Sequence, residues 1–272
     1  MNVTFDMLVS ELVKAARKSF LELFENGEKF YYCVLVTVGE AYCPHVTAWS
    51  WEALERVAHE KSSQEGAIYG NFEEAKERIK WMYAESPYSI FKYDENFEDA
   101  ITLFNQLPTL DDVYDSGGEN EWDKQYKFRL DIMEATMKQL DYEGIFALNQ
   151  PRDEVYINVE MVYPDCNDKA RAFRLNKPED IAMSMWFEEV GQYIEGHPEN
   201  LITWELHILH IGNMKTEVMK LLRKDCNIPL PEIKSYISKL PILAGKGSEL
   251  EISRLASSYE NIGCTVSIKQ CN

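Results

Sequence analysis

The stretch from Phe30 to Ser50, FYYCVLVTVGEAYCPHVTAWS, decides the fold of this chain, because no other segment combines so many β-branched and aromatic residues. Phe30–Val38 is nearly all apolar, which is typical of a strand that is covered on both faces. Residues 39–42 predict a short turn, and Cys43–Trp49 predicts a returning strand. A buried helix could carry the same apolar run, but Tyr, Val and Thr favour a strand. We therefore expect a β-hairpin at the centre of the fold.

Helical patterns lie on both sides of this hairpin. Apolar residues recur at helical spacing from Leu8 to Phe24, and Ser50 predicts the N-cap of a helix that runs from Trp51 to about Glu60. Asn71 and Glu74 have the spacing of a capping box. Further helices are predicted over residues 96–107, 126–140 and 178–194, a strand over residues 145–148, and a half-buried strand over residues 155–163. Residues 109–120, TLDDVYDSGGEN, predict a solvent-exposed loop.

The charge distribution suggests two domains. Residues 1–200 contain 19 Lys and Arg against 39 Asp and Glu, a net charge of −20, whereas residues 201–272 contain 9 against 7, a net charge of +2. We place the boundary between Glu195 and Asn200, where Gly, His and Pro also interrupt the helical pattern. The sequence predicts an α+β fold: residues 1–195 form an acidic domain with a mainly antiparallel sheet packed by helices, and residues 201–272 form a small β-α-α-β-α-β sandwich.

The composition limits the classes of function. An acidic surface repels nucleic acid and most membranes and favours a basic protein partner, although acidity can also serve solubility alone. The N-terminal sequence lacks the basic start and apolar stretch of a signal peptide, so we expect a cytoplasmic protein. The six cysteines form no CxxC pair, which favours reduced, buried thiols over a zinc site or a disulfide framework.

Signatures of catalysis are missing from the sequence. It has no phosphate-binding glycine loop, no HExxH, no GxSxG and no dinucleotide fingerprint. His207 and His210 are three apart in a predicted strand, which points them to opposite faces. Cys43 and His45 could suggest a nucleophile and its base, but two packed hairpin residues are the simpler reading. We predict no catalytic residue, no metal site and no cofactor. The acids Asp131, Glu134, Glu188 and Glu189 are expected on exposed helix surfaces.

The C-terminal segment carries one family resemblance. Residues 217–241, EVMKLLRKDCNIPLPEIKSYISKLP, and residues 248–269, SELEISRLASSYENIGCTVSIK, follow the order and spacing of two helices, then a third helix and a last strand. In this, Trp204–Lys269 resembles the C-terminal domain of the bacterial ribosomal stalk protein, which recruits translational GTPases.

This resemblance implies a partner-facing surface. In that family, basic residues of the first two helices face the GTPases, and the residues at matching positions are Lys220, Arg223 and Lys234. Pro229 and Pro231 depart from the glycine-rich turn of the family, and the dimerising N-terminal domain and hinge are absent. The chain is therefore not a stalk protein, and the three basic residues could equally form an ordinary solvated helix face.

The N-terminal segment carries a second resemblance, in four motifs: FYYCVLVTVG at residues 30–39, TAWSWEAL at residues 47–54, RIKWMYAESPY at residues 78–88 and EGIFALNQPRDEVYINVEM at residues 143–161. They resemble a bacterial domain family of unknown function, numbered 4303, that is associated with polymorphic toxin loci and immunity roles. The resemblance implies no catalytic residue. Trp81, Pro87 and Tyr88 within these motifs are expected to be structural.

Three hypotheses follow. The first is an immunity protein that neutralises a basic toxin by occluding it, with a contact surface on the predicted loop. The second is a translation-linked adaptor that binds a GTPase through the C-terminal domain, and the third is an unrecognised enzyme. The candidate contact residues for the first hypothesis are Asp111, Asp112, Asp115, Glu119 and Glu121.

Overall fold

The computed structural model describes residues 3–63, 68–162, 166–194, 203–226, 228, 232–247 and 249–271. The chain divides into two compact units, Met1–Gly196 and His197–Asn272, and each has its own hydrophobic core. The predicted boundary between Glu195 and Asn200 lies outside the described residues, as do Pro229 and Pro231. Among the residues that the structure describes, no helix has the length and apolar character needed to cross a membrane.

The N-terminal unit is built on the predicted hairpin. Strands β1 (Phe30–Thr37) and β2 (His45–Ser50) pair antiparallel, and every residue of β1 is buried. Strand β3 (Tyr156–Met161) pairs with the other side of β1 in parallel. The sheet order is therefore β2-β1-β3. The α+β class is confirmed, and the sheet of this unit combines one antiparallel pair with one parallel pair.

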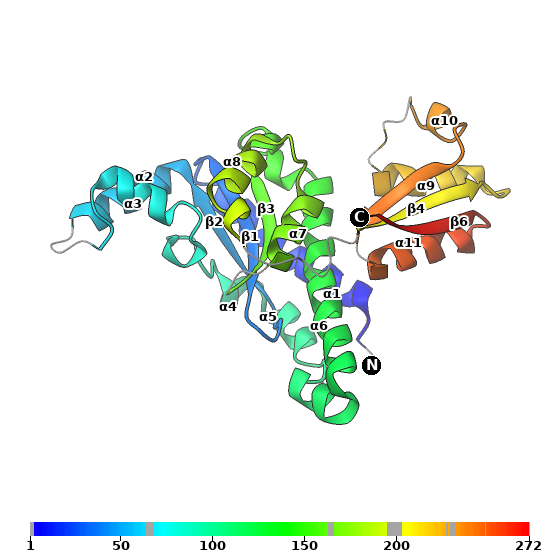
Figure 1. The fold of residues 1–272 in the computed structure, drawn as a ribbon, viewed down its shortest axis with the longest axis horizontal. Coiled ribbons are helices and arrows are strands. Elements are labelled where there is room, and N and C mark those ends of the chain that lie inside the picture. Colours follow the sequence, from blue (N-terminus) through cyan, green and yellow to red (C-terminus); the bar gives the residue numbers. More distant parts are fainter. Residues whose placement is uncertain are drawn as a thin grey trace. The chain divides into compact units, whose positions relative to one another are not determined.

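Helices cover both faces of this sheet (Figure 1). On one face a core of aliphatic and phenylalanine side chains joins β1 to α1 (Phe5–Phe24), α5 (Glu98–Phe104) and α6 (Leu110–Tyr142). The other face is rich in tyrosine and tryptophan side chains and joins β1 to a second set of helices. That set includes α2 (Trp51–Ser63), α3 (Phe72–Ile79) and α8 (Ile181–Glu189).

Short helical segments connect these elements. They are η1 (Tyr83–Glu85), α4 (Tyr93–Asn96), η2 (Ile145–Ala147), η3 (Arg152–Glu154) and η4 (Gly191–Tyr193). The predicted capping box at Asn71 and Glu74 is confirmed. The oxygen of Ser50 also accepts a hydrogen bond from the backbone N–H of Ala53 at 2.9 Å, as expected of an N-cap.

Three local predictions are wrong. Residues 110–120 belong to helix α6, apart from a kink at Gly118 where the backbone is not helical, so the predicted loop is absent there. The strand predicted at residues 145–148 is instead the single turn η2, which follows the left-handed Gly144. Strand β3 is buried on both faces and not on one, because α8 and the aromatic core cover the face that carries Tyr156 and Glu160.

Helix α7 (Cys166–Leu175) was not predicted, and it closes the outer edge of β3. Arg171 donates from Nε to the carbonyl of Val159 at 2.9 Å. Just after the helix, Asn176 accepts from the N–H of Ile157 at 3.0 Å and donates to its carbonyl at 2.7 Å. Side chains therefore take the place of a fourth strand at this edge.

The C-terminal unit has the predicted element order. It consists of β4 (Thr203–His210), α9 (Lys215–Cys226), α10 (Ile233–Tyr236), β5 (Ile242–Gly247), α11 (Glu249–Asn261) and β6 (Thr265–Cys271). The sheet order is β5-β4-β6, and both pairings are antiparallel. Leu206 and Ile208 of the central strand are fully buried against side chains from α9 and α11.

Candidate functional site

The predicted contact residues lie on a projecting part of α6, which we call the acidic arm (residues 109–127). Thr109 starts the helix, because its hydroxyl oxygen accepts a hydrogen bond from the N–H of Asp112 at 3.1 Å. Buried Leu110 and Val113 hold the first turns against the unit. At Gly118 the backbone leaves helical geometry, with φ 73° and ψ −168°, so the helix bends there. The arm is therefore an angled helical projection.

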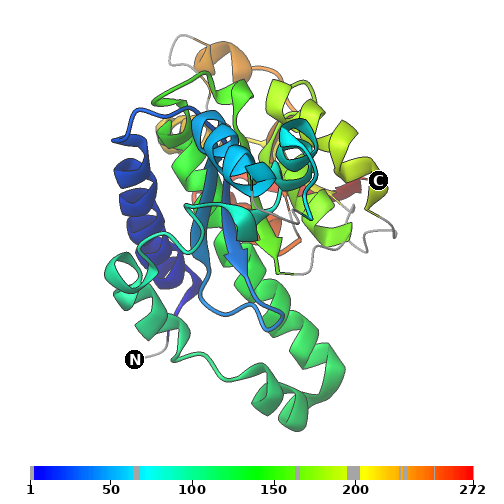
Figure 2. The same ribbon diagram turned by 90° about the vertical axis from the view of Figure 1, so that its left-hand side faces the viewer.

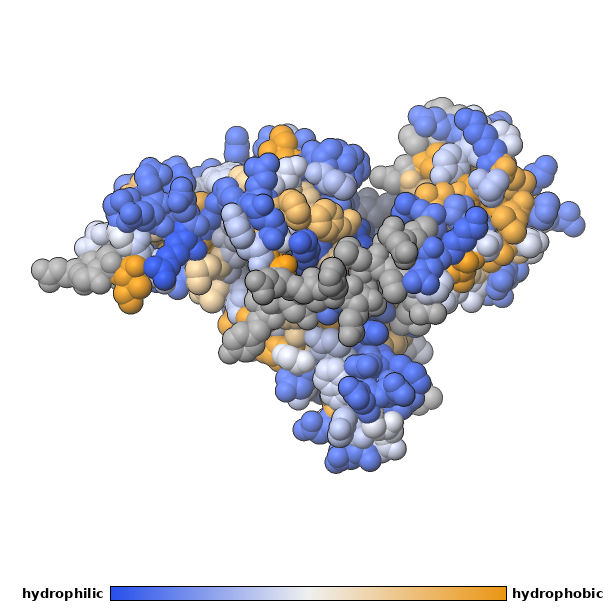
Figure 3. Space-filling model, in the orientation of Figure 1, coloured by the Kyte–Doolittle hydropathy of each residue, from blue (hydrophilic) through white to orange (hydrophobic). Residues whose placement is uncertain are grey.

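The acids of the arm face solvent. The arm contains six acidic residues and two lysines, and all five predicted contact residues are exposed. Asp112 accepts a hydrogen bond from the Thr109 hydroxyl at 2.6 Å, and Glu121 pairs with Lys124 at 2.5 Å. In Figure 3 the lower lobe that this part of α6 forms is mostly hydrophilic. Asp111, Asp115 and Glu119 have exposed carboxylates that can meet a partner.

Aromatic side chains accompany these acids. Tyr114 is 56% exposed, which is high for a tyrosine on a helix. Trp122 stacks on Tyr126, with ring centroids 4.9 Å apart and an interplanar angle of 17°. Tyr and Trp supply much of the binding energy in protein interfaces, because they bury a large rigid area. The arm thus combines charged groups that steer a partner with aromatic groups that can anchor it.

A buried arginine fixes the base of the arm. Arg129 is only 2% exposed and donates to the carbonyl of Glu40 at 3.2 Å and to the carbonyl of Pro108. Burial lowers the pKa of this guanidinium. Glu40 lies in the turn of the central hairpin, which Figure 2 shows beside α6. Arg129 therefore joins the base of the arm to the hairpin turn.

A second cluster with unusual chemistry lies in the core of the same unit. The carboxyl of Glu160, on β3, is 7% exposed and accepts a hydrogen bond from the Tyr32 hydroxyl at 2.5 Å. The Tyr156 hydroxyl also lies near this carboxyl and favours its charged form. Tyr32 and Tyr156 stand opposite each other on β1 and β3, with their rings nearly parallel at 4°. The parallel register therefore directs both hydroxyls toward one carboxyl.

The pKa of Glu160 is raised to about 8, mainly by burial and also by the nearby carboxylate of Asp168, while Tyr32, Tyr156 and Arg171 oppose the shift. Asp168 itself forms a buried ion pair with Arg171. Asn158 donates to the Tyr156 hydroxyl at 2.8 Å, and its side-chain oxygen is buried without a partner among the residues the structure describes. A protonated buried carboxyl is common in catalytic acids. This cluster is the feature that favours the enzyme hypothesis.

Comparison with known proteins places this unit in a family. The profile of a domain of unknown function, DUF4303, matches residues 12–177, which is more than half of the chain. The chain belongs to the DUF4303 family. The comparisons with curated proteins and with solved structures find no match. The DUF4303 match contains the hairpin, β3, the acidic arm and Glu160, and it ends one residue after Asn176, which closes the edge of β3.

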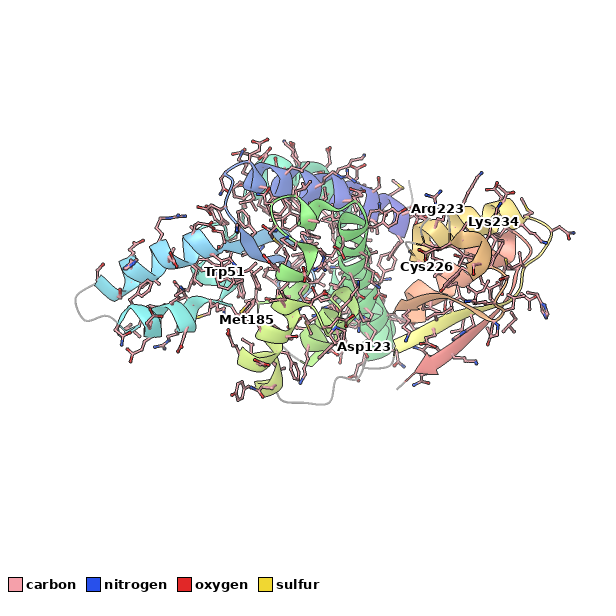
Figure 4. The ribbon with its side chains drawn as sticks, turned by 90° about the horizontal axis from the view of Figure 1, so that it is seen from above. Trp51, Asp123, Met185, Arg223, Cys226 and Lys234 are labelled. Carbon is pink, nitrogen blue, oxygen red and sulfur yellow. The ribbon has the colours of Figure 1, made fainter. Side chains whose placement is uncertain are left out.

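Two of the motif residues of the DUF4303 segment, Trp81 and Tyr88, make contacts with other side chains, and Pro87 lies between them in the sequence. Trp81 contacts the rings of Tyr31, Tyr32 and Tyr156 edge-on, and its Nε1 donates to Glu189 at 2.6 Å. Tyr88 donates its hydroxyl to Glu28 at 2.7 Å. Pro87 is exposed between them. Trp51 and Met185, which are labelled in Figure 4, both contact the Lys80 ammonium, and this group also lies over the Trp81 ring.

Several groups of the DUF4303 unit were not predicted as notable. Glu134 was expected to be exposed, but it is buried and accepts two hydrogen bonds from Arg174, at 2.8 and 2.7 Å. Glu160 lies within an apolar strand, and the only sign in the sequence that it is unusual is the presence of an acid among β-branched neighbours. Tyr114 offered a clearer signal, since an aromatic residue in the acidic run TLDDVYDSGGEN is unusual for an idle loop.

The basic residues of the C-terminal unit lie outside the DUF4303 match. Lys220, Arg223 and Lys234 are all exposed, and Lys220 pairs with Glu217 at 2.9 Å. Figure 4 shows Arg223 and Lys234 along the same border of the unit. The first two residues lie on α9 and the third on α10, and these helices contact each other. The three positions therefore lie on two neighbouring helices.

Two other residue pairs of the sequence, Cys43 with His45 and His207 with His210, have the following surroundings. Burial raises the pKa of the Cys43 thiol to about 12 and lowers the pKa of His45 to about 4, so neither takes its charged form near neutral pH. His207 pairs with Glu205 at 2.9 Å, while His210 is exposed three residues further along β4. Within the described ranges, no three His, Cys, Asp or Glu side chains are placed to hold a metal ion.

Proposed function

We propose that this protein is an immunity protein that neutralises a basic partner protein by occluding its active surface. The observation that carries the proposal is the acidic arm, which presents exposed carboxylates beside the exposed Tyr114 on a base fixed by Arg129. A nuclease toxin needs a basic surface for its phosphate substrate, and an acidic protein can compete for that surface. The charge of −20 on residues 1–200 adds steering at long range.

The first experiment uses purified proteins. The full chain is mixed with inactivated versions of the proteins encoded by the genes beside its own, and binding is measured by calorimetry at low salt and at 0.15 M salt. We expect one of these proteins, a basic one, to bind at both salt concentrations and to lose toxicity when the unaltered pair is produced together. If none of them binds at low salt, the proposal is wrong.

A matched pair of variants tests the role of the arm. Asp115→Lys with Glu119→Lys changes the charge by +4 on the arm, and Glu60→Lys with Glu77→Lys makes the same change on exposed positions of α2 and α3. The arm variant should lower the association rate at least about tenfold more than the control, because local charge complementarity governs encounter. Equal effects of the two variants would mean that only the overall charge matters.

A translation-linked adaptor is the second candidate function. It is favoured by the predicted element order of the C-terminal unit and by the exposure of Lys220, Arg223 and Lys234 on the neighbouring helices α9 and α10. Replacing all three by Glu should abolish capture of a translational GTPase under this proposal and leave toxin binding unchanged under the first. The same variant therefore separates the two candidates.

A further inference from the structure

Within the described parts of the chain, three of the four sheet edges are closed by other segments of the chain. At the edge of β2, the hydroxyl of Ser86 donates to the carbonyl of Ala48 at 2.5 Å, and the N–H of Phe91 donates to the carbonyl of Val46 at 3.0 Å. At the edge of β3, α7 and Asn176 take the place of a neighbouring strand. Such coverage prevents unwanted pairing with other strands.

The edge of β5 in the C-terminal unit is closed in the same manner. The hydroxyl of Tyr236 donates to the carbonyl of Leu243 at 3.0 Å, and the thiol of Cys226 donates to the carbonyl of Ala244 at 3.1 Å. Tyr236 comes from α10 and Cys226 from α9, so these two helices cover this border of the sheet.

The edge of β6 differs from the other three. Strand β6 pairs with β4 along its whole length, and no hydrogen bond between described residues reaches its outer side. Thr265, Lys269 and Gln270 are exposed, and Ile268 is 37% exposed although it belongs to the core side of the sheet opposite Leu206. A seven-residue strand with this exposure is long enough to accept another strand.

We propose that β6 pairs antiparallel with β6 of a second copy of this chain, which joins two three-stranded sheets into one sheet of six strands. Charge favours a second copy at this place: residues 201–272 have a net charge of +2, so two such units meet with little of the repulsion that a net −20 would create. The pairing is symmetric, as expected for an isologous dimer.

The sequence of β6 is compatible with itself in this arrangement. In an antiparallel pair centred on Ser267, Ile268 lies opposite Val266 of the second copy, and Lys269 lies opposite Thr265 of the second copy. The single charged residue of the strand therefore meets a hydroxyl and not another lysine. Pairing also removes Ile268 from water.

The expected register can be tested by placing a negative or a positive charge at Thr265, because the two charges should change the stability of the dimer in opposite directions. Thr265→Glu should strengthen the dimer and Thr265→Lys should weaken it, each by about 2- to 30-fold, because two cross-strand pairs with Lys269 form across the two-fold axis. Thr265 is exposed, so both variants should fold as the unaltered chain does. Sedimentation velocity of the full chain over a range of micromolar concentrations gives the dissociation constants.

A second pair of variants distinguishes the edge from the face of the sheet. Ile268→Lys on β6 should weaken the dimer at least about tenfold, whereas Leu209→Lys, at the same exposure of 37% on the central strand β4, should leave it unchanged. Circular dichroism checks that each variant is folded. The proposal is overturned if the unaltered chain stays monomeric at every concentration, if both Thr265 variants change the dimer alike, or if Leu209→Lys weakens it as much as Ile268→Lys.

Discussion

Glu160 links the stability of the N-terminal unit to pH. In the folded chain its carboxyl keeps the proton up to about pH 8, whereas in the unfolded chain it releases the proton near the ordinary value of 4.5. Between these values the folded chain binds one proton more, so the free energy of unfolding falls as pH rises, at most by about 1.4 kcal/mol per pH unit. Below about pH 4.5 this effect disappears.

The variant Glu160→Gln isolates this effect, since glutamine still accepts the hydrogen bond from Tyr32 and carries no titrating proton. Urea unfolding between pH 5 and pH 8 should show a flatter pH dependence for Glu160→Gln than for the unaltered chain, and a gain in stability at pH 8. Glu119→Gln, on the exposed arm, should follow the unaltered chain. Identical slopes for Glu160→Gln and the unaltered chain would contradict the assignment.

Glu134 shows the opposite case, a buried carboxylate that stays charged. Burial alone raises its pKa, but Arg174 and Lys138 lower it more, to about 2. Arg174→Met should reduce the free energy of unfolding at pH 7 by about 3–5 kcal/mol, because it leaves a buried charge with one weaker partner. Adding Glu134→Met should restore most of this loss in urea unfolding. A loss below about 1 kcal/mol in the single variant would mean that water reaches the site.

The bend in α6 depends on a single glycine. Gly118 has φ 73° and ψ −168°, a combination that only glycine adopts without strain, although a Cβ there would meet no atom within 4 Å. Gly118→Ala should therefore destabilise the arm by about 1–3 kcal/mol and speed hydrogen exchange at residues 110–117. Gly39→Ala, in the hairpin turn without a positive φ, serves as the control. Unchanged exchange in Gly118→Ala would contradict the prediction.

The success of prediction from sequence depended on the kind of element. The hairpin and α1 were predictable because their apolar patterns match their burial. Helix α7 was not, because Arg171 and Arg174, which donate hydrogen bonds to β3 and α6, place charged residues on the inner side of the helix. The arm was mistaken for a loop because Gly117 and Gly118 outweighed the capping signal of Thr109 and the spacing of its buried anchors.

The candidate contact surface could be predicted from the sequence, but the buried cluster around Glu160 could not. The acids of the arm could be chosen from composition alone, since exposed charge is a property of single residues. The environment of Glu160 could not, because it depends on the parallel register between β1 and β3 and on α8 covering that face. Alternation within one strand contains no information about the strand's second neighbour.

The two units should respond to mutation independently. Their cores share no residue, so a cavity in one leaves the other intact. Leu12→Ala and Ile252→Ala each remove a fully buried side chain, in the N-terminal and the C-terminal unit respectively, at a loss of about 2–5 kcal/mol. Calorimetry of the full chain should show two transitions, each lowered by one variant only. A joint shift of both transitions would show that the units unfold as one.

The parallel pairing of β1 with β3 has a consequence for biosynthesis. The hairpin leaves the ribosome early, but β1 ends at Thr37 and β3 begins only at Tyr156, so a long intervening segment must be translated before the sheet can be completed. During that interval one side of a strand that is entirely buried in the folded protein has no neighbour. Chaperones that shield nascent apolar segments are therefore expected to act on this protein until Asn176 has emerged and the last edge of its first sheet is sealed.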